Sequence, residues 1–235
     1  MPVIAQKLPY NVYSIQDIGK TRLATKNFVP GTRVYGEKLV SKNGIEYRLW
    51  SPHRSKLAAM IEKGMNIPIE PDSSVLYLGA ASGTTASHVS DMVTTGRVFA
   101  VEFAPRVMRD LINVCIPRRN LIPILADAAK PVSYKAITGM VDVIYQDVAQ
   151  PGQAGIAIAN ARESLKPGGH LIMVIKARSV DSTVNPKQVF NQELEKLYTE
   201  FNVLDTKELE PFHKDHLALV AIIKPQKKQV YEDKN

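Results

Sequence analysis

The spacing of hydrophobic positions changes near residue 50 of this 235-residue chain. Before that point, apolar and polar residues alternate in short stretches separated by turn signals at Pro30-Gly31 and Asn43-Gly44. Such alternation predicts antiparallel strands, and an Asn-Gly pair suits a two-residue hairpin turn because both positions tolerate a positive φ. We expect residues 1–50 to form a small antiparallel β domain that packs on the rest of the chain, because so small a sheet is marginally stable alone. The expected strands are 11–15, 22–28, 33–40 and 45–50.

From Ser51 onward, short apolar runs alternate with segments of helical periodicity. Runs such as 75–79 are continuously apolar, which is typical of strands buried on both faces of a parallel sheet. Repeated strand–helix alternation predicts an α/β domain over 51–228, with a mostly parallel sheet and helices on both faces, followed by a polar tail at 229–235. We expect strands at 75–79, 98–102, 121–127, 141–147, 170–177 and 216–223, and helices near 55–65, 84–93, 105–116, 153–165 and 186–201.

Composition narrows the class of protein. Hydrophobic residues make up 45% of the chain, yet no uninterrupted run approaches the roughly 20 residues of a membrane-spanning helix, and the first residues lack the layout of a secretory signal. A single cysteine, Cys115, excludes an internal disulfide and favours an intracellular location. The net charge of +7 suits a polyanionic partner without identifying it.

The first strand of the expected parallel sheet leads directly into GAASGTTASHVSD, residues 79–91. Small residues allow a tight turn close to a ligand, and the following helix offers free N–H groups. The glycines Gly79 and Gly83 do not have the G-x-G-x-x-G spacing, so their spacing alone fits a structural turn as well as a binding loop.

Acidic residues at the ends of the next strands favour the binding loop. Glu102 follows the loop by about 20 residues, where an acidic side chain can hydrogen-bond both ribose hydroxyls. Asp127, followed by Ala128, is placed to meet the exocyclic amine of an adenine, and Asp147 ends the fourth strand. These side chains predict a nucleoside cofactor but leave open whether it carries a nicotinamide or a methyl sulfonium.

Long blocks of the chain resemble the successive motifs of the fibrillarin family. They are WSPHRSKLAA, VLYLGAASGTTASHVSD, GRVFAVEFAPRVMRDL, NLIPILADAAKP, VDVIYQDVAQPGQA, MVIKARSVD and PFHKDHLALV, which together cover most of residues 33–223. Fibrillarins are the methyltransferase subunits of box C/D guide-RNA particles, so the resemblance implies a Rossmann-like S-adenosylmethionine methyltransferase sheet. The Gly/Arg-rich extension of eukaryotic members is absent. The chain therefore resembles the compact archaeal form, for which we expect a cytoplasmic location.

The resemblance also implies a set of cofactor contacts. Hydroxyls and helix N–H groups at Thr84 and Thr85 suit the methionine carboxylate. Phe103 would stack near the adenine, although an apolar residue there could equally belong to the core. The whole implied set is Gly79, Ala81, Ser82, Gly83, Thr84, Thr85, Glu102, Phe103, Asp127, Ala128, Asp147 and Gln150.

A catalytic group is implied at Lys56, Asp147, Lys176 and His216. Methyl transfer to a 2′-hydroxyl requires in-line positioning and removal of a weakly acidic proton. We favour Lys176 as the proton acceptor, with Lys56 lowering its pKa and Asp147 orienting it. Without the resemblance, Lys56 would be a solvated helix lysine, Asp147 a cap of a helix or turn, and His216 the partner of a backbone group.

The resemblance implies a box C/D guide RNA, a target RNA, a Nop-family scaffold protein and a kink-turn-binding ribosomal-type protein as partners. No RNA-recognition signature is present, which agrees with target selection by guide-RNA pairing. The five histidines lack metal-ligand spacing, so we expect no metal. Candidates for phosphate contacts are Arg48, Lys56, Lys187, Arg118, Arg119 and, as the two preferred residues, Arg54 and Arg178.

The expected function is guide-RNA-directed 2′-O-methylation of ribose in rRNA, with tRNA as a further substrate. One alternative is an S-adenosylmethionine enzyme that modifies a base, a cap or a small molecule. Another is a non-catalytic subunit of an RNA particle, which Asp147 and Lys176 argue against. A nicotinamide-dependent dehydrogenase is disfavoured by the departure from G-x-G-x-x-G.

Overall fold

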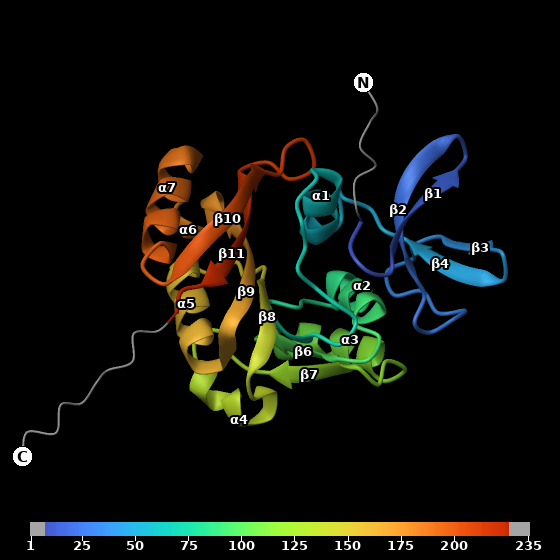
Figure 1. Ribbon diagram of the computed structural model, residues 1–235, viewed down its shortest axis with the longest axis horizontal. Helices are drawn as coiled ribbons and strands as arrows, with labels where there is room; N and C mark the ends of the chain where they lie inside the picture. The colour runs from blue at the N-terminus through green and yellow to red at the C-terminus, as the bar shows by residue number, and fades with distance from the viewer. Residues whose placement is uncertain (1–7, 226–235) are drawn as a thin grey trace, which may run out of the picture.

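The computed structural model describes residues 8–225, which form two sheets (Figure 1). The polar tail expected at 229–235 lies outside the described residues. The N-terminal sheet has the order β1-β2-β4-β3 and is antiparallel throughout. Its strands are β1 (Val12–Asp17), β2 (Lys20–Lys26), β3 (Leu39–Lys42) and β4 (Ile45–Leu49).

The hairpin turn predicted at Asn43-Gly44 is confirmed. Lys42 pairs with Ile45, and the two residues between them have φ angles of 52° and 73°. The strand expected at 33–40 begins only at Leu39. Residues 34 and 35 instead direct their N–H groups to the carboxylate of Glu37, which closes a loop where a strand was expected.

The larger sheet has seven strands in the order β10-β11-β9-β8-β5-β6-β7. The five from β5 to β9 are parallel, whereas β11 runs antiparallel to both of its neighbours. This is the mostly parallel sheet that the strand–helix alternation predicts. The strands are β5 (Ser74–Leu78), β6 (Arg97–Glu102), β7 (Leu121–Leu125), β8 (Val141–Gln146), β9 (Leu165–Lys176), β10 (Phe201–Glu208) and β11 (His216–Ile223).

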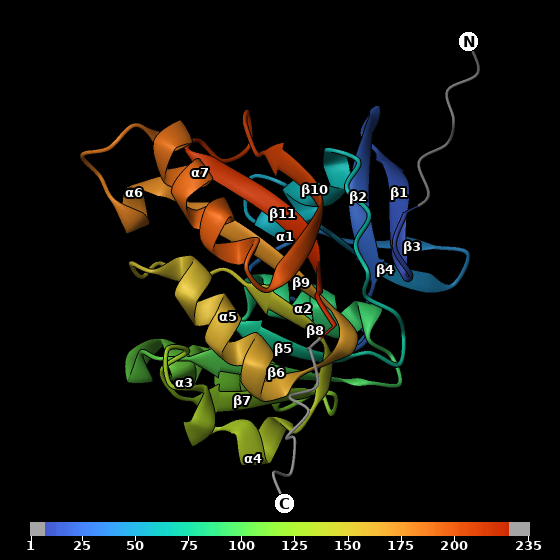
Figure 2. The same cartoon turned by 60° about the vertical axis from the view of Figure 1, so that its left-hand side comes forward.

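Helices cover both faces of this sheet (Figures 1 and 2). Alternate residues of each strand enter two separate cores: Tyr77 and Tyr145 pack with α1, α2 and α3, whereas Leu76 and Ile144 pack with α5 and α7. This alternation explains why the central strands are apolar without interruption. The helices are α1 (Lys56–Glu62), α2 (Thr84–Met92), α3 (Pro105–Cys115), α4 (Lys135–Thr138), α5 (Gln153–Ser164), α6 (Ala177–Val180) and α7 (Pro186–Leu197), with a short 3-10 turn at Pro131–Ser133.

The segment 186–208 differs from the sequence-based expectation. The helix expected to reach residue 201 ends at Leu197, and Phe201–Glu208 forms the edge strand β10. Only Phe201 of this strand is buried, so its hydrophobic pattern is weak. Its conformation comes from backbone pairing with β11, a contact between distant parts of the chain that a local pattern does not reveal.

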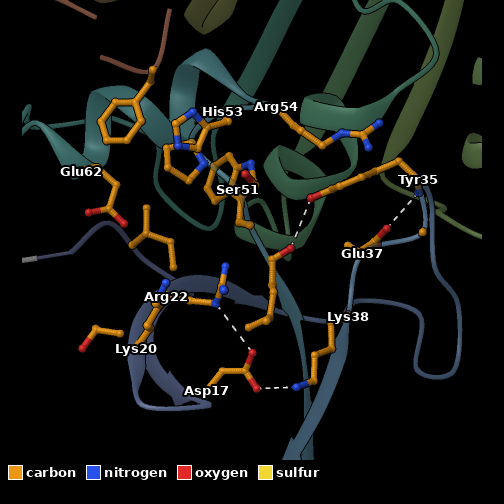
Figure 3. A pocket seen from close by; sticks show the side chains of 17 residues that line it. Asp17, Lys20, Arg22, Tyr35, Glu37, Lys38, Ser51, His53, Arg54 and Glu62 are labelled. Atoms are coloured by element: carbon orange, nitrogen blue, oxygen red, sulfur yellow. Dashed lines mark hydrogen bonds and ion pairs between the residues drawn. The ribbon is translucent and has the colours of Figure 1, made fainter. Parts of the chain in front are cut away.

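A hollow of about 570 Å³ is lined by residues of the N-terminal sheet, by residues 49–54 and by Glu62 of α1 (Figure 3). Charged side chains line the hollow, and several of them pair with one another. Asp17 makes ion pairs with Arg22 and Lys38, and the guanidinium of Arg54 lies 5.1 Å from the ring centroid of Tyr35. None of the expected cofactor residues lines this hollow.

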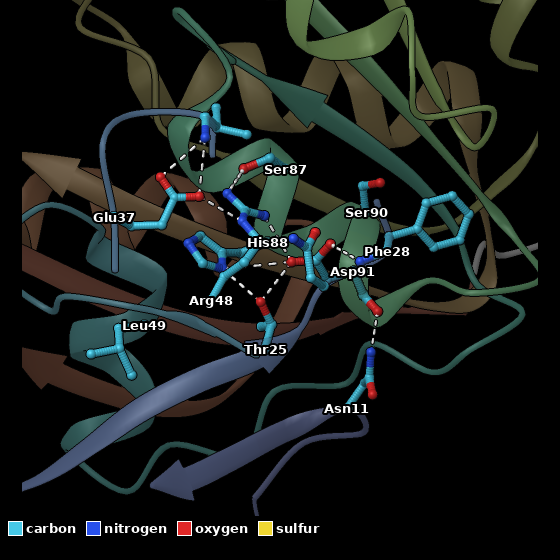
Figure 4. A network of polar contacts seen from close by, with 12 residues as sticks. Asn11, Thr25, Phe28, Glu37, Arg48, Leu49, Ser87, His88, Ser90 and Asp91 are labelled. Carbon is cyan, nitrogen blue, oxygen red and sulfur yellow. Dashed lines mark hydrogen bonds and ion pairs between the residues drawn. The ribbon is translucent and has the colours of Figure 1, made fainter. Parts of the chain in front are cut away.

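A buried ionic network joins the N-terminal sheet to α2 (Figure 4). Arg48 of β4 pairs with Glu37 at 2.6 Å and with Asp91 of α2 at 2.7 Å. Arg118 donates to the other carboxylate oxygen of Asp91 at 2.7 Å. Arg48 and Arg118 are 0% and 1% exposed. The expectation that these two arginines contact RNA phosphates is therefore wrong, because their charges are used inside the protein.

Candidate functional site

The carboxyl ends of β5, β6, β8 and β9 meet at one edge of the sheet, and the loop after β5 closes on this edge. The N–H groups of Gly79 and Ala80 both donate to Val101 O at 3.0 Å. Gly79 has a φ of 82°, and a Cβ there would lie 3.0 Å from Asp147 O. A glycine is required at this position because the loop runs directly against the end of β8.

Glu102, at the end of β6, holds the same loop. Its carboxylate accepts the N–H of Ala81 at 2.9 Å and that of Ala104 at 2.8 Å. Each carboxylate oxygen keeps a further lone pair, so Glu102 can still accept a ligand hydroxyl. The loop geometry thus depends on the residue expected to meet the ribose.

A cavity of about 290 Å³ opens beside this loop. Phe103 stands over it with 63% of its surface exposed, which packing in the core does not explain. The cavity brings together eight of the residues expected from the sequence: Gly79, Ala81, Glu102, Phe103, Ala128, Asp147, Gln150 and Lys176.

The other expected cofactor residues lie around the cavity. Ser82 and Thr84 line an adjoining hollow together with Arg54, and Gly83 is the left-handed N-cap of α2. Asp127 accepts the N–H of Ala129 at 2.9 Å and so caps a local turn. Thr85 is buried, and its hydroxyl donates to Ser55 rather than facing the cavity.

These features fit a nucleoside cofactor that carries a carboxylate. An exposed aromatic ring and a carboxylate acceptor flank the cavity. Helix α2 begins without a side-chain cap, which leaves its first N–H groups free for an anion. The donors and acceptors of S-adenosylmethionine therefore match what the chain offers here.

Asp147, on the wall of the cavity, lies between Lys176, which also lines the cavity, and Lys56, which does not. Lys56 Nζ is 3.1 Å from Asp147 Oδ2, and Lys176 Nζ is 2.8 Å from Asp147 Oδ1. Lys176 also donates to the backbone oxygen of Asp147 at 2.7 Å. The three side chains are between 13% and 19% exposed, so they are screened from water but open to a substrate.

The pKa of Lys176 is lowered from its ordinary value. Burial is the main cause, since it disfavours the charged ammonium, and the neighbouring Lys56 acts in the same direction. Asp147 opposes the shift by stabilising the ammonium. The net result is a lysine that gives up its proton more readily than a solvated one.

His216 lies beside this group, on the first residue of β11, which pairs with Lys176 across the sheet. Burial lowers the pKa of the imidazole, and its Nδ1 is 2.5 Å from Lys214 O. His213 was not singled out from the sequence, yet its ring centroid lies 5.8 Å from that of His216 and its Nε2 contacts Pro52 O at 2.8 Å. Both imidazoles lie within electrostatic reach of Lys56.

Gln153 is a second residue that the sequence did not reveal. It is the first residue of α5 and is fully buried, and its Oε1 accepts the main-chain N–H of Lys176 at 3.0 Å. Its only local signal is its position after Pro151-Gly152, which indicates a helix start and nothing about Lys176.

The two preferred candidates for phosphate contacts, Arg54 and Arg178, do not line the 290 Å³ cavity. Arg54 is exposed next to the start of α1. Arg178 pairs with Asp215 at 3.0 Å and donates to Ser182 O at 2.9 Å, so these two contacts already fix the position of its guanidinium. Lys187 is exposed at the start of α7, and the guanidinium of Arg119 lies 5.9 Å from the ring centroid of Phe28.

No helix within residues 8–225 has the length and apolar character needed to cross a membrane. Nor does that range contain a group of three or more His, Cys, Asp or Glu side chains that could hold a metal ion.

Comparison with known proteins gives a consistent result. The family model described as Fibrillarin matches residues 3–225. A protein of Methanosarcina barkeri named fibrillarin-like rRNA/tRNA 2′-O-methyltransferase is 56% identical over 209 residues, which are 87% of this chain and 92% of that protein.

Solved structures extend the comparison. Aeropyrum pernix fibrillarin, in complex with natively bound S-adenosyl-L-methionine, matches with a TM-score of 0.86 and 48% identity, over 92% of this chain and 95% of the other. A chain of a fibrillarin/Nop5p complex matches with a TM-score of 0.85 and 43% identity, over 93% and 100% of the two chains. Matches of this extent and identity, together with the cavity and its residues, show that the chain belongs to the fibrillarin family.

Proposed function

We propose that this protein transfers a methyl group from S-adenosylmethionine to the 2′-hydroxyl of a ribose in RNA. The observation that carries the proposal is the Lys56–Asp147–Lys176 group, of which Asp147 and Lys176 line the cofactor cavity. The relatives named 2′-O-methyltransferases and the fibrillarin structure with bound cofactor support it. Methylation of a base nitrogen would not need such a group.

S-adenosylmethionine, when bound, supplies an activated methyl group, and the protein positions the acceptor and manages its proton. Lys176 Nζ would accept the proton of the 2′-hydroxyl as the hydroxyl oxygen takes the methyl group and the cofactor sulfur, losing its positive charge, leaves as a neutral thioether. Because its pKa is lowered, a larger fraction of Lys176 is present as the neutral amine than in a solvated lysine. Asp147 holds Lys176 in place, and the ammonium of Lys56 disfavours a second positive charge beside it.

We also propose that the protein acts as the catalytic subunit of a box C/D guide-RNA particle, with rRNA and tRNA as targets. Its partners would be a guide RNA, a Nop-family scaffold protein and a kink-turn-binding protein. The matching chain in a fibrillarin/Nop5p complex and the net charge of +7 support this assembly. Arg54 and Arg178 would contact phosphates of the RNA.

The cytoplasm is the location that we propose. Cys115 is a buried free thiol, and burial raises its pKa to about 12, so it is protected as a thiol. A chain whose one cysteine is unpaired suits a reducing compartment.

The proposal is tested by reconstituting the protein with its scaffold, the kink-turn protein and a box C/D guide RNA. Labelled methyl transfer to a complementary RNA is compared with transfer to the same RNA carrying a 2′-deoxy sugar at the targeted nucleotide. Loss of transfer with the deoxy substrate is expected. Transfer that persists would move the reaction to a base, and an assembled particle that binds cofactor without transfer would point to a scaffold role.

A further inference from the structure

The hydroxyl of Thr85 does not face the cofactor cavity. The side chain is 7% exposed, and the residues that line the 290 Å³ cavity do not include it. Its Oγ1 donates to Ser55 Oγ at 3.0 Å. The bond joins the first turn of α2, which follows the cofactor loop, to the residue that precedes α1.

Ser55 determines where α1 begins. It is the N-cap of this helix, its Oγ accepts the N–H of Ala58 at 3.3 Å, and it is 2% exposed. Lys56 is the first residue of α1, and its Nζ lies 3.1 Å from Asp147 Oδ2. The position of Ser55 therefore sets the point from which the Lys56 side chain reaches Asp147.

Two buried tyrosines, Tyr77 and Tyr145, lie next to the Thr85–Ser55 hydrogen bond, which is called the bridge below. Tyr77 of β5 is in hydrogen-bonding contact with Thr85, and its ring packs on Tyr145 of β8 with centroids 4.6 Å apart. Burial raises the pKa of both phenols well above the usual range, so both stay neutral. The Thr85 hydroxyl is thus engaged by both Tyr77 and Ser55.

We propose that Thr85 is a positioning residue for Lys56, acting through Ser55, and that its hydroxyl is not a cofactor ligand. The bridge connects the helix that begins at the cofactor loop with the helix that carries Lys56. The inference rests on the proposed methyl transfer, in which Lys56 and Asp147 set the proton affinity of Lys176. Replacing Thr85 by valine removes the hydroxyl but keeps the shape and the backbone N–H.

The test compares Thr85→Val with Thr85→Ser, which keeps the hydroxyl, in the assembled particle. Thr138→Val, at a buried threonine of α4, is the matched control. We expect the valine variant to slow single-turnover methyl transfer about tenfold. Its Kd for S-adenosylmethionine should stay within about twofold of the wild-type value. Thr85→Ser should recover most of the rate, and the control should keep all of it.

A loss of cofactor affinity that matches the loss of rate would overturn the inference, because the hydroxyl would then be a ligand. An unchanged rate in Thr85→Val would overturn it as well.

A second measurement does not depend on turnover. The side-chain ammonium of Lys56 is observed by NMR in the ¹⁵N-lysine-labelled chain, assigned with Lys56→Arg. The ammonium protons of Lys56 are expected to exchange slowly with water in the wild type and in Thr85→Ser. In Thr85→Val they are expected to exchange rapidly. An identical signal in all three would overturn the bridge even in an active particle. If the wild-type particle transferred no methyl group, the proposed function would be overturned. The exchange rate of the Lys56 ammonium would still test the Thr85–Ser55 bridge, because it does not depend on turnover.

Discussion

The side-chain oxygen of Gln153 accepts the main-chain N–H of Lys176 at 3.0 Å, although the two residues are 23 positions apart. The contact ties the first turn of α5 to the last residue of β9. The side-chain amide of Gln146 donates to Gln153 O at 2.8 Å, so the end of β8 is also hydrogen-bonded to the first residue of α5. The backbone under Lys176 is thereby fixed by a side chain that the ligand cavity does not include.

Gln153→Ala should therefore weaken both the fold and the reaction. It leaves the N–H of Lys176 without its acceptor, which costs about 1–3 kcal/mol when a buried donor is left unsatisfied. Urea unfolding and single-turnover methyl transfer measure the two effects. Gln188→Ala, at an exposed position of α7, is the control and should change neither. An unchanged rate in Gln153→Ala would show that Lys176 does not need this anchor.

The pH dependence of methyl transfer should report the free amine of Lys176. Because burial lowers its pKa below the solvated value of about 10.4, the rate should rise with pH and level off before that value. Asp147 raises the pKa, so Asp147→Asn should move the profile to lower pH while reducing its plateau. Single-turnover rates over a pH series measure this, with Lys176→Arg expected to be inactive throughout. A flat profile in the wild type would argue against Lys176 as the proton acceptor.

Arg48→Met should destabilise the protein strongly. It removes one partner of a buried ion pair and leaves Glu37 and part of Asp91 uncompensated, which costs about 3–5 kcal/mol. Chemical denaturation gives the free energy of unfolding. Arg22→Met, which breaks the half-exposed pair with Asp17, should change it by less than about 1 kcal/mol. Equal midpoints for the two variants would contradict the assignment of Arg48 to the interior.

His88 should make stability fall in acid. Burial and the adjacent charges of Arg48 and Arg118 depress its pKa well below the ordinary value. The folded state therefore stays unprotonated while the unfolded chain takes up a proton as the pH falls below about 6.5. The free energy of unfolding therefore falls by up to about 1.4 kcal/mol per pH unit below that pH, and the contribution of neutral His88 to it is fully present above that pH. His88→Asn should show a shallower fall in urea unfolding between pH 7 and pH 5, and parallel curves would refute this role.

Arg54→Ala should weaken binding of the particle to its RNA without changing target choice. A lost phosphate contact should lower the slope of log affinity against log salt by about 0.7–0.9. The guanidinium over the Tyr35 ring is already oriented, so the loss should approach that of one full contact. Arg162→Ala, on α5 at the opposite face of the sheet, is the control for net charge. Salt-titrated affinities distinguish the two variants.

Much of the α/β domain was predictable because the information is local. Uninterrupted apolar runs such as 75–79 require burial on two faces, and the glycines after them mark the tight turn against β8. The residues of the Lys–Asp–Lys group were obtained from family motifs. Their spacing of 91 and 29 positions carries no signal by itself.

The remainder depended on contacts between distant parts of the chain. Arg48 in an alternating strand has the same local pattern whether it faces RNA or Asp91, and only the folded chain reveals the carboxylates around it. The strand Phe201–Glu208 is held by its neighbour rather than by its own composition. The bond from Thr85 to Ser55 joins residues 30 positions apart and was likewise invisible in the sequence.

The carboxylate of Asp91 is shared by Arg48 and Arg118, one on each side of residue 50. A fragment that began at residue 51 would keep Arg118 and Asp91 but lose Arg48, Thr25 and the backbone N–H of Phe28, which all donate to that carboxylate. The N-terminal sheet is thus not a removable appendage. Both sheets should melt in one cooperative step, and the smallest active enzyme should include both of them.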